Sequence, residues 1–390
     1  MPQISRFILA ATGCLAISVV AAADSPPQAR YRVTVLSSAG ASGNSIDNLG
    51  LTSGSYTLAS GALHASVWAF GQQKDLGTLG SGSGLSSRVQ WPVKNVLGLI
   101  SGISLTDQLD PNREGWSCGF FLNNPNFNVC LGFVWDPRSG RMRPLPTLGG
   151  TNGFATGTNN LGETVGWAEN TVHDPTCIPP QSLQFKPVVW GPGREEIHAL
   201  PLPDGDTSGA ATALNDRGQI VGISGTCGFA VGGPTGKHAV LWDNGIATVL
   251  VNPNGAPFWN TPMMINEQGE VVGFAGVPGD PAGNFTPPFM WTKTQGWVFL
   301  PMLSGDIAGV ATSINARRQV VGYSNDANGN FHPWIWQHGV TTNLNALIEP
   351  GSGLSGPILL AFDINDLGEI TGTTSTGQAF VATPIGGDDD

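Results

Sequence analysis

Charged residues are scarce in this sequence. Only 12% of the 390 residues are Asp, Glu, Lys or Arg, and 17 basic residues face 28 acidic ones, which gives a formal net charge of −11. No run or cluster of Lys and Arg occurs. Proteins that bind nucleic acid or anionic membranes use such basic patches to neutralise phosphates. We therefore expect neither kind of partner.

Motifs of common catalytic and cofactor sites are also missing. The sequence contains no G-x-S-x-G elbow, no H-E-x-x-H pair, no P-loop and no dinucleotide fingerprint. Its cysteines form no C-x-x-C pair, and no histidines are paired at metal-ligand spacing. We expect no cofactor and no metal, and the sequence leaves any catalytic residue unknown.

Long apolar runs are confined to the N-terminus. One basic residue, Arg6, precedes an apolar run of 14 residues at 7–20, and the small residues Ala21 and Ala23 follow it. This run is shorter than the roughly 20 residues that span a bilayer, and the pattern is that of a signal peptide. The sequence predicts a signal peptide at 1–23 with cleavage near Ala23, a secreted or periplasmic protein without a membrane span, and an acidic tail at 386–390.

Glycine, by contrast, is abundant, with 55 residues, and many of them belong to a repeated unit. The clearest copy spans residues 208–251 and contains four short runs, at 210–214, 219–224, 238–242 and 246–251. The runs are separated by turn sequences rich in Asn, Asp and Gly, such as NDRG and DNG, which are typical of β-hairpins. The unit therefore predicts a four-stranded antiparallel meander.

Two features of the unit can be counted independently. The first-turn motif occurs seven times and begins at Asp47, Asn95, Asn159, Asn215, Asn266, Asn315 and Asn365. The third run also occurs seven times and ends at Trp68, Trp135, Trp190, Trp242, Trp291, Trp336 and, in a degenerate copy, Ala382. Units of about 50 residues with four strands each are typical of a β-propeller.

The fourth run is missing from the last unit, but a run of that character, YRVTVL at 31–36, precedes the first unit. If this N-terminal strand completes the last sheet, the ring closes without an unpaired blade edge. We predict one all-β domain at 24–385, a β-propeller of seven four-stranded blades closed by the N-terminal strand. Six or eight blades, or an open β-solenoid, are the alternatives.

The units resemble the HAF repeat, named for a His-Ala-Phe signature. The segments that carry this resemblance are VVGYSNDANGNFHPWIWQHGVTTNL and ALNDRGQIVGIS with HAVLW, and the resemblance covers roughly residues 40 to 385. The signature histidine occurs at His64, His238 and His332. The resemblance implies a bacterial extracellular protein, from a family whose function is largely uncharacterised.

Four cysteines follow the expected signal peptide. An even number of cysteines in an exported chain predicts two disulfides. Cys118 with Cys130 would close a loop inside the second unit, and Cys177 with Cys227 would tie equivalent loops of the third and fourth units.

One face of the predicted propeller carries the long links. In a meander, the links between the second and third strands and those between blades lie on the same face, and here they are long and irregular. The link from Leu105 to Cys130 contains Trp116, Phe120, Phe121 and Phe127 among several asparagines. These aromatic residues are our candidates for a ligand surface, for instance for a glycan. The alternative, which we favour, is that they fold back as a small satellite core.

Three acidic residues are the candidates for an enzyme site. Asp204, Asp206 and Asp306 lie in Gly-containing links between units. Carboxylates from separate blades can form the acid pair of a glycosidase. We nevertheless predict a non-catalytic binding or scaffold propeller, a monomer that binds an unknown protein or glycan through the long-loop face. The alternative is a secreted glycan-acting hydrolase or lyase.

Overall fold

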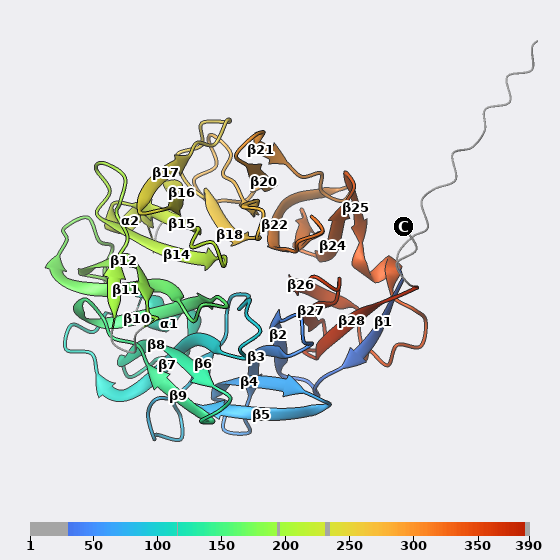
Figure 1. Cartoon of the computed structure of the whole chain (residues 1–390), viewed down its shortest axis with the longest axis horizontal. Coiled ribbons are helices and arrows are strands. Elements are labelled where there is room, and N and C mark those ends of the chain that lie inside the picture. The colour runs from blue at the N-terminus through green and yellow to red at the C-terminus, as the bar shows by residue number, and fades with distance from the viewer. Residues whose placement is uncertain (1–29, 115, 193–195, 231–234, 387–390) are drawn as a thin grey trace, which may run out of the picture.

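The computed structural model describes residues 30–114, 116–192, 196–230 and 235–386. The expected signal peptide and residues 387–390 of the expected acidic tail lie outside these residues. Within them, seven four-stranded antiparallel sheets stand in a ring around a central channel (Figure 1). This arrangement confirms the predicted seven-bladed β-propeller and excludes six blades, eight blades and an open solenoid.

The strands of each blade follow one another from the channel outward. Blades 1 and 2 contain β2 (Ala41–Ile46), β3 (Thr52–Thr57), β4 (Leu63–Ala69) and β5 (Gln72–Gly77), then β6 (Ser87–Arg88), β7 (Ile100–Leu109), β8 (Asn128–Asp136) and β9 (Arg141–Pro144). Blades 3 and 4 contain β10 (Gly149–Thr158), β11 (Thr164–His173), β12 (Leu183–Trp190) and β13 (Ile197–Ala199), then β14 (Ser208–Leu214), β15 (Ile220–Gly225), β16 (His238–Asp243) and β17 (Ile246–Leu250). Blades 5 and 6 contain β18 (Thr261–Ile265), β19 (Val271–Phe274), β20 (Pro288–Thr292) and β21 (Gly296–Phe299), then β22 (Asp306–Ile314), β23 (Val320–Asp326), β24 (Phe331–Gln337) and β25 (Val340–Asn343). Blade 7 contains β26 (Ile358–Ile364), β27 (Ile370–Thr374), β28 (Ala379–Ile385) and β1 (Arg30–Val35).

The N-terminal strand closes the ring, as predicted. Strand β1 pairs antiparallel with β28, in a register that runs from Arg30 opposite Ile385 to Val35 opposite Phe380. The two ends of the described chain therefore share blade 7, where blue and red strands lie side by side in Figure 1. This pairing gives blade 7 its outer strand and joins the first and last blades.

The glycine that ends each first-turn motif is required by close packing against the inner strand. A Cβ on Gly222 would lie 2.1 Å from the carbonyl oxygen of Ala210, and the equivalent glycines of the other six blades give 1.9 to 2.2 Å to an inner-strand carbonyl. Real Cβ atoms do not approach oxygen so closely, so only glycine fits. The repeated glycine that reveals the unit in the sequence thus has a steric cause.

The repeated tryptophans pack between blades, although unequally. Trp68, Trp135, Trp190 and Trp242 are buried, and the indole N–H of Trp242 donates to the carbonyl of Pro201 at 2.6 Å. The equivalent residues of blades 5 and 6, Trp291 and Trp336, are only partly buried. The tryptophans of blades 1 to 4 therefore bury more of their apolar surface than those of blades 5 and 6.

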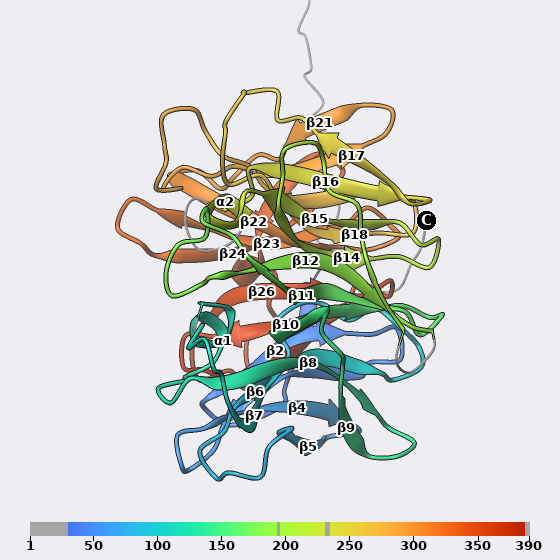
Figure 2. The same cartoon turned by 90° about the vertical axis from the view of Figure 1, so that its left-hand side faces the viewer.

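The two faces of the ring differ in the length of their loops. Helices α1 (Trp116–Phe121) and α2 (Cys227–Ala230) lie in links between second and third strands, on the same face of the ring (Figure 2). A 3-10 helix, η1 (Leu344–Leu347), follows β25. The short first and third turns lie on the opposite face. Among the described residues, no helix combines the length and the apolar character needed to cross a membrane.

Candidate functional site

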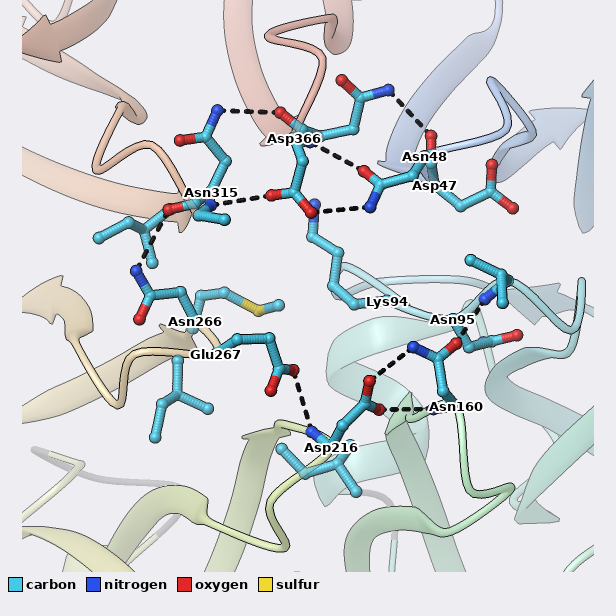
Figure 3. A pocket seen from close by; sticks show the side chains of 17 residues that line it. Asp47, Asn48, Lys94, Asn95, Asn160, Asp216, Asn266, Glu267, Asn315 and Asp366 are labelled. Carbon is cyan, nitrogen blue, oxygen red and sulfur yellow. Dashed lines mark hydrogen bonds between the residues drawn. The ribbon is translucent and has the colours of Figure 1, made fainter.

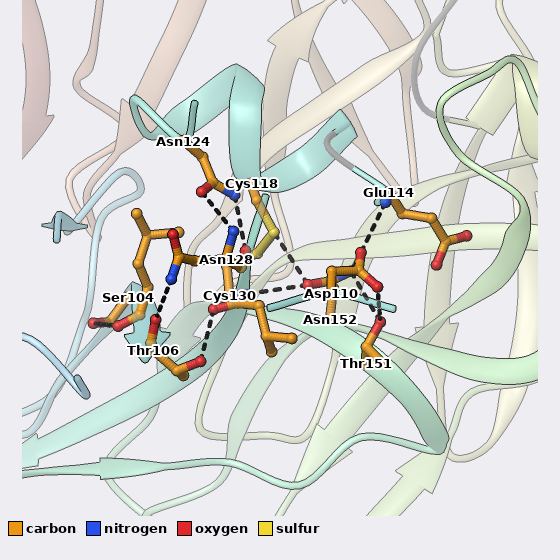
Figure 4. Close-up of a disulfide and its surroundings, with 12 residues drawn as sticks. Ser104, Thr106, Asp110, Glu114, Cys118, Asn124, Asn128, Cys130, Thr151 and Asn152 are labelled. Carbon is orange, nitrogen blue, oxygen red and sulfur yellow. Dashed lines mark hydrogen bonds between the residues drawn. A yellow bond between two sulfur atoms is a disulfide. The ribbon is translucent and has the colours of Figure 1, made fainter. Parts of the chain in front are cut away.

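The long link of blade 2 is held rigidly on the long-loop face. Cys118 and Cys130 form the first predicted disulfide, with a Cα–Cα distance of 5.6 Å (Figure 4). Within this ring, the side chain of Asn124 accepts from the backbone N–H of Asn128 and donates to its carbonyl, both at 2.8 Å. Covalent closure and these hydrogen bonds fix the loop before any ligand arrives.

The second predicted disulfide joins neighbouring blades on the same face. Cys177, in the link of blade 3, is bonded to Cys227, the first residue of α2 in blade 4. Both predicted pairings are therefore confirmed. The backbone N–H of Cys227 also donates to Thr176 Oγ1 at 3.1 Å, so the two links are joined by more than the sulfur atoms.

The aromatic residues of the blade 2 link are divided between core and surface. Phe121 is partly buried and packs edge-on against Phe154 and Trp91, with ring centroids 4.9 and 5.4 Å away, as the satellite-core alternative predicts. Phe120 is 72% exposed. Phe127 is partly buried, and the guanidinium of Arg113 lies 5.0 Å from its ring centroid. Trp116 begins α1, but its side chain lies outside the described part of the structure.

An amide-lined groove is formed in part by residues 123–128 of the link that carries Phe120. It has a volume of about 280 Å³ and is lined by Gly82, Gly84, Leu85, Leu105, Asp107, Asn123, Asn124, Pro125, Asn126 and Asn128. The side chains of Asn123 and Asn126 are exposed, and Asp107 on the opposite wall holds the backbone N–H groups of the 81–82 turn. Hydrogen bonding from Ser81 lowers the pKa of Asp107, so this wall carries a negative charge. Side-chain amides supply both donors and acceptors to such a groove.

Three buried carboxylates accept hydrogen bonds in and around the same link. Asp110, Glu114 and Glu169 are each at most 3% exposed. Glu114 accepts from the backbone N–H groups of Ser182 and Leu183 in the link of blade 3, at 2.7 and 2.5 Å, and so ties the two links together. In the part of the chain that the structure describes, none of the three carboxylates forms an ion pair.

Burial dominates the titration of Glu169. Burial raises its pKa to about 7, and the charge of Glu114 adds to the effect. Hydrogen bonds from Gln181 and Asn152 act in the opposite direction and do not cancel it. Sequence reasoning missed this cluster, because its members are far apart in the chain and share no motif.

The structure does not bring Asp204, Asp206 and Asp306 together. Asp204 is exposed, whereas the side chains of Asp206 and Asp306 are buried in different blades, 4 and 6, where they hold equivalent positions. Asp206 and Asp306, candidates for a glycosidase pair, are each bound to a histidine and a serine of their own blade, and no hydrogen bond between described residues joins one to the other.

Asp206 instead forms an internal link within its blade. It accepts from Nδ1 of His238 at 2.7 Å and from Ser224 Oγ at 2.5 Å, and Asp306 binds His332 and Ser324 in the same way. Burial opposes ionisation of Asp206, but these hydrogen bonds, with the charges of His238 and Lys237, outweigh it and lower its pKa. In a catalytic triad the serine binds the histidine, whereas here both bind the carboxylate. The set joins three strands and does not activate the serine.

The mouth of the channel on the short-turn face is encircled by the first turns (Figure 3). The first residue of each turn, here called the turn residue, is Asn in six blades and Asp47 in blade 1. Each turn asparagine donates through Nδ2 to a backbone carbonyl of the next blade, at 2.9 to 3.2 Å. The acceptor is the next turn residue in five cases, whereas Asn95 donates to Thr158, the residue before the next turn. Among the described residues, only the step from blade 1 to blade 2 lacks this link, because the carboxylate of Asp47 has no N–H.

Carboxylates of the next turn position add a second set of links. Asp216, Glu267 and Asp366 each accept the backbone N–H of the preceding blade, from Asn160, Asp216 and Ala316 at 2.8 to 3.0 Å (Figure 3). They line a pocket of about 90 Å³. Partial burial raises the pKa of Glu267, and the charges of Asp216 and Asp366 add to the effect.

An ion pair between Lys94, which lines this pocket, and the buried Asp363 joins blades 2 and 7, which lie on either side of blade 1. Lys94 of blade 2 places Nζ 2.5 Å from Oδ1 of Asp363 in blade 7. Asp363 is fully buried and also accepts from the backbone N–H of Ile46 and from Ser313 Oγ. The side chain of Asp363 therefore contacts blades 1, 2 and 6 as well as its own, which marks the channel mouth as a structural centre. Within the described residues, no three His, Cys, Asp or Glu side chains are placed to hold a metal ion together.

Comparison with known proteins identifies no family for this chain. No family model and no curated protein sequence matches the chain. Solved propellers are similar at low identity. The β-propeller domain of the Trilobed protease from Pyrococcus furiosus is 11% identical, with 78% of this chain and 81% of that chain covered and a TM-score of 0.44. Virginiamycin B lyase from Staphylococcus aureus is 10% identical, with 92% and 100% covered and a TM-score of 0.44. A gluconolactonase from Xanthomonas campestris is 8% identical, with 91% and 90% covered and a TM-score of 0.39. At such identities the similarity concerns the fold alone.

Proposed function

We propose that this protein is a non-catalytic binding propeller that binds a glycan on the long-loop face of blade 2. The binding region, here called the blade 2 surface, consists of Phe120 and the amide-lined groove that contains Asn123 and Asn126. The protein would be secreted or periplasmic, like the HAF-repeat proteins that its sequence resembles. Its two disulfides favour an oxidising compartment and support this location.

The observation that carries the proposal is the exposed ring of Phe120 in the same link as a groove lined by side-chain amides. The ring offers an apolar face of the kind that packs against the C–H face of a sugar, and the amides can donate to and accept from hydroxyl groups. The disulfide and the Asn124 hydrogen bonds hold the loop in place, so little conformational entropy is lost on binding.

The interpretation as a non-enzyme rests on how the candidate catalytic groups are used. The two Asp-His-Ser sets form strand-to-strand links, and the carboxylates at the channel mouth accept backbone N–H groups of neighbouring blades. These contacts give each group a structural role. The competing hypothesis is a secreted glycan-acting hydrolase or lyase, and it predicts turnover.

A glycan-array and polysaccharide-turnover screen on residues 24–390 tests the proposal. We expect binding without turnover, and we expect Phe120→Ala to weaken binding about tenfold, which corresponds to the roughly 1.4 kcal/mol of one anchoring contact. Phe70→Ala is the matched control, because Phe70 is also exposed and lies in a third turn on the opposite face. Turnover that survives Phe120→Ala would favour the enzyme. Binding that is lost in Phe70→Ala but kept in Phe120→Ala would place the ligand on the short-turn face and contradict the proposal.

A further inference from the structure

Arg88 is a half-buried cation for which the described residues provide no counter-ion. It ends the short inner strand of blade 2, and burial lowers its pKa. Its Nη1 lies 3.5 Å from the carbonyl of Phe121, a long hydrogen bond, and its buried Nε has no acceptor in the described part of the chain. No described carboxylate pairs with it, although acidic residues outnumber basic ones by 28 to 17. A guanidinium carries five N–H donors in a planar fork, so most of its hydrogen-bonding capacity is unused.

Arg88 borders an open hollow of about 270 Å³ on the long-loop face. The other lining residues come from blade 1 and from the last turn of blade 7, namely Gly40, Ala41, Ser42, Ser55, Leu63 and Gly377. Ser42 and Ser55 are paired across β2 and β3, so their side chains project from the same face of the sheet. The contact between Arg88 and Phe121 places the hollow beside α1, the helix that carries Phe120.

Ser55 provides a second unused donor at the same hollow. The residue is 2% exposed, and its Oγ has no hydrogen-bond partner. Buried hydroxyl groups are nearly always hydrogen-bonded in folded proteins, so an unpaired one that lines a hollow indicates a missing partner. A cationic fork and a hydroxyl donor at one hollow are complementary to a group that accepts several hydrogen bonds and carries negative charge.

We propose that this hollow binds a carboxylate, with the guanidinium of Arg88 donating to its two oxygens and the hydroxyl of Ser55 donating to one of them. A planar carboxylate matches the guanidinium fork better than a neutral acceptor does. The inference rests on the proposed function and narrows the ligand class, since a glycan that lies on the blade 2 surface and reaches this hollow would carry an acidic sugar.

The direct test is an NMR titration of the ¹⁵N-arginine-labelled protein that follows the Nε–H signal of Arg88. The probes are glucuronate, the neutral sugar glucose, sulfate and inorganic phosphate. We expect a saturable shift of this signal with glucuronate and none with glucose. Absence of a shift with every anion would overturn the proposal, and tighter binding of sulfate or phosphate than of glucuronate would overturn the carboxylate assignment.

Variants separate recognition from folding. Arg88→Lys keeps the charge but loses the fork, and we expect glucuronate to bind about tenfold more weakly to it. Ser55→Ala should weaken binding about fivefold, and Arg143→Gln, on the exposed outer strand of the same blade, should leave it unchanged. Equal affinity in Arg88→Lys and the unchanged protein would contradict the fork geometry. Arg88→Lys also assigns the signal if larger changes at Arg88 prevent folding.

The Arg88 titration and the glycan array with Phe120→Ala together distinguish the failure of one proposal from the failure of the other. If Arg88 responds to glucuronate but no glycan on the array binds through Phe120, the carboxylate site stands and the proposed function fails. If array glycans bind through Phe120 while Arg88 responds to no anion, the proposed function stands and the carboxylate site fails.

Discussion

The step from blade 1 to blade 2 offers the sharpest test of how the ring is held together. Six turn asparagines each donate to the next blade, and Asp47 stands where the seventh donor would be. Asp47 already accepts from the backbone N–H groups of Leu49 and Leu51 through Oδ1, both at 2.8 Å. Asp47→Asn keeps that oxygen and replaces the other one by an NH₂ group. We expect it to donate to the turn of blade 2, as its six counterparts do.

The magnitude follows from two terms. One additional hydrogen bond contributes about 0.5–1.5 kcal/mol net. Burial raises the pKa of Asp47, so the ionised carboxylate is disfavoured in the folded state, and removing its charge relieves that cost. Lost attraction to Lys94 opposes the gain. We expect Asp47→Asn to raise the free energy of unfolding by about 1 kcal/mol at pH 7.5, a shift of about 0.3 M in the urea midpoint if the slope is about 3 kcal/mol per M.

The pH dependence of this gain gives a second, independent test. A carboxyl group whose pKa is raised on folding stabilises the folded state as the pH falls, because the folded protein binds the proton more strongly. Protonated Asp47 also has an O–H to donate. The advantage of Asp47→Asn should therefore be largest at neutral pH and shrink towards pH 4. The converse variant, Asn215→Asp, should cost about 1–3 kcal/mol at pH 7.5.

Urea unfolding of the three proteins at pH 7.5 and pH 4 is the assay. A variant Asp47→Asn that is no more stable than the unchanged protein at pH 7.5 would refute the missing-link account. A gain of the same size at both pH values would refute the role assigned to the charge of Asp47.

Three further predictions concern buried charges. Lys94→Met should lower the free energy of unfolding, measured in urea, by about 3–5 kcal/mol, because Asp363 stays buried without its cation. The double variant Lys94→Met, Asp363→Asn should recover part of this loss. No recovery would argue against the ion pair as the cause. The free energy of unfolding should fall by about 3 kcal/mol as the pH rises from about 4.5 to about 7, because the raised pKa of Glu169 makes the folded state hold a proton that the unfolded chain releases. Glu169→Gln should flatten this fall. An unchanged slope in that variant would exclude Glu169 as the origin of the pH dependence. Asp206→Ala should lower the free energy of unfolding by about 1–3 kcal/mol, because Ser224 and His238 lose their acceptor. The exposed control Asp204→Ala should change it by less than about 0.5 kcal/mol. Equal effects of the two variants would contradict the linking role of Asp206.

The periodic features of the fold could be predicted from the sequence because each has a local steric or hydrogen-bonding cause. Gly222 and its six counterparts lie where any side chain would meet an inner-strand carbonyl, and the turn asparagines cap their own turns. Such causes recur in every blade, so they appear as a repeat. The seven blades and the closing strand followed from that repeat, and the two disulfides followed from the even number of cysteines.

The contacts that are made only once could not be predicted in the same way. Lys94 of blade 2 and Asp363 of blade 7 meet past blade 1, and the repeat alone does not tell which side chains of non-adjacent blades make contact. The sequence does contain one indication of this contact. Lys94 directly precedes a turn residue, at the position that Leu214, Ile314 and Ile364 hold in other units. A charge at a position that is apolar elsewhere in a repeat indicates a buried partner.

The candidate site shows the same division. The sequence indicated the blade 2 link, but it could not show that Phe121 packs inward while its neighbour Phe120 points outward, because the direction of each ring depends on a short helix closed by a disulfide. The sequence could not indicate Arg88, since its distinguishing property is that no described carboxylate pairs with it in the folded structure.

Hydrogen–deuterium exchange in the presence of a glycan that the array selects would test the central claim most directly. We predict slower exchange on binding in residues 80–85 and 118–128, which contain Phe120 and most residues of the groove. We predict no change in the turns that begin at Asn159, Asn215 and Asn266, which lie on the opposite face. Protection of those turns with none in the blade 2 link would contradict the account and place the ligand at the channel mouth.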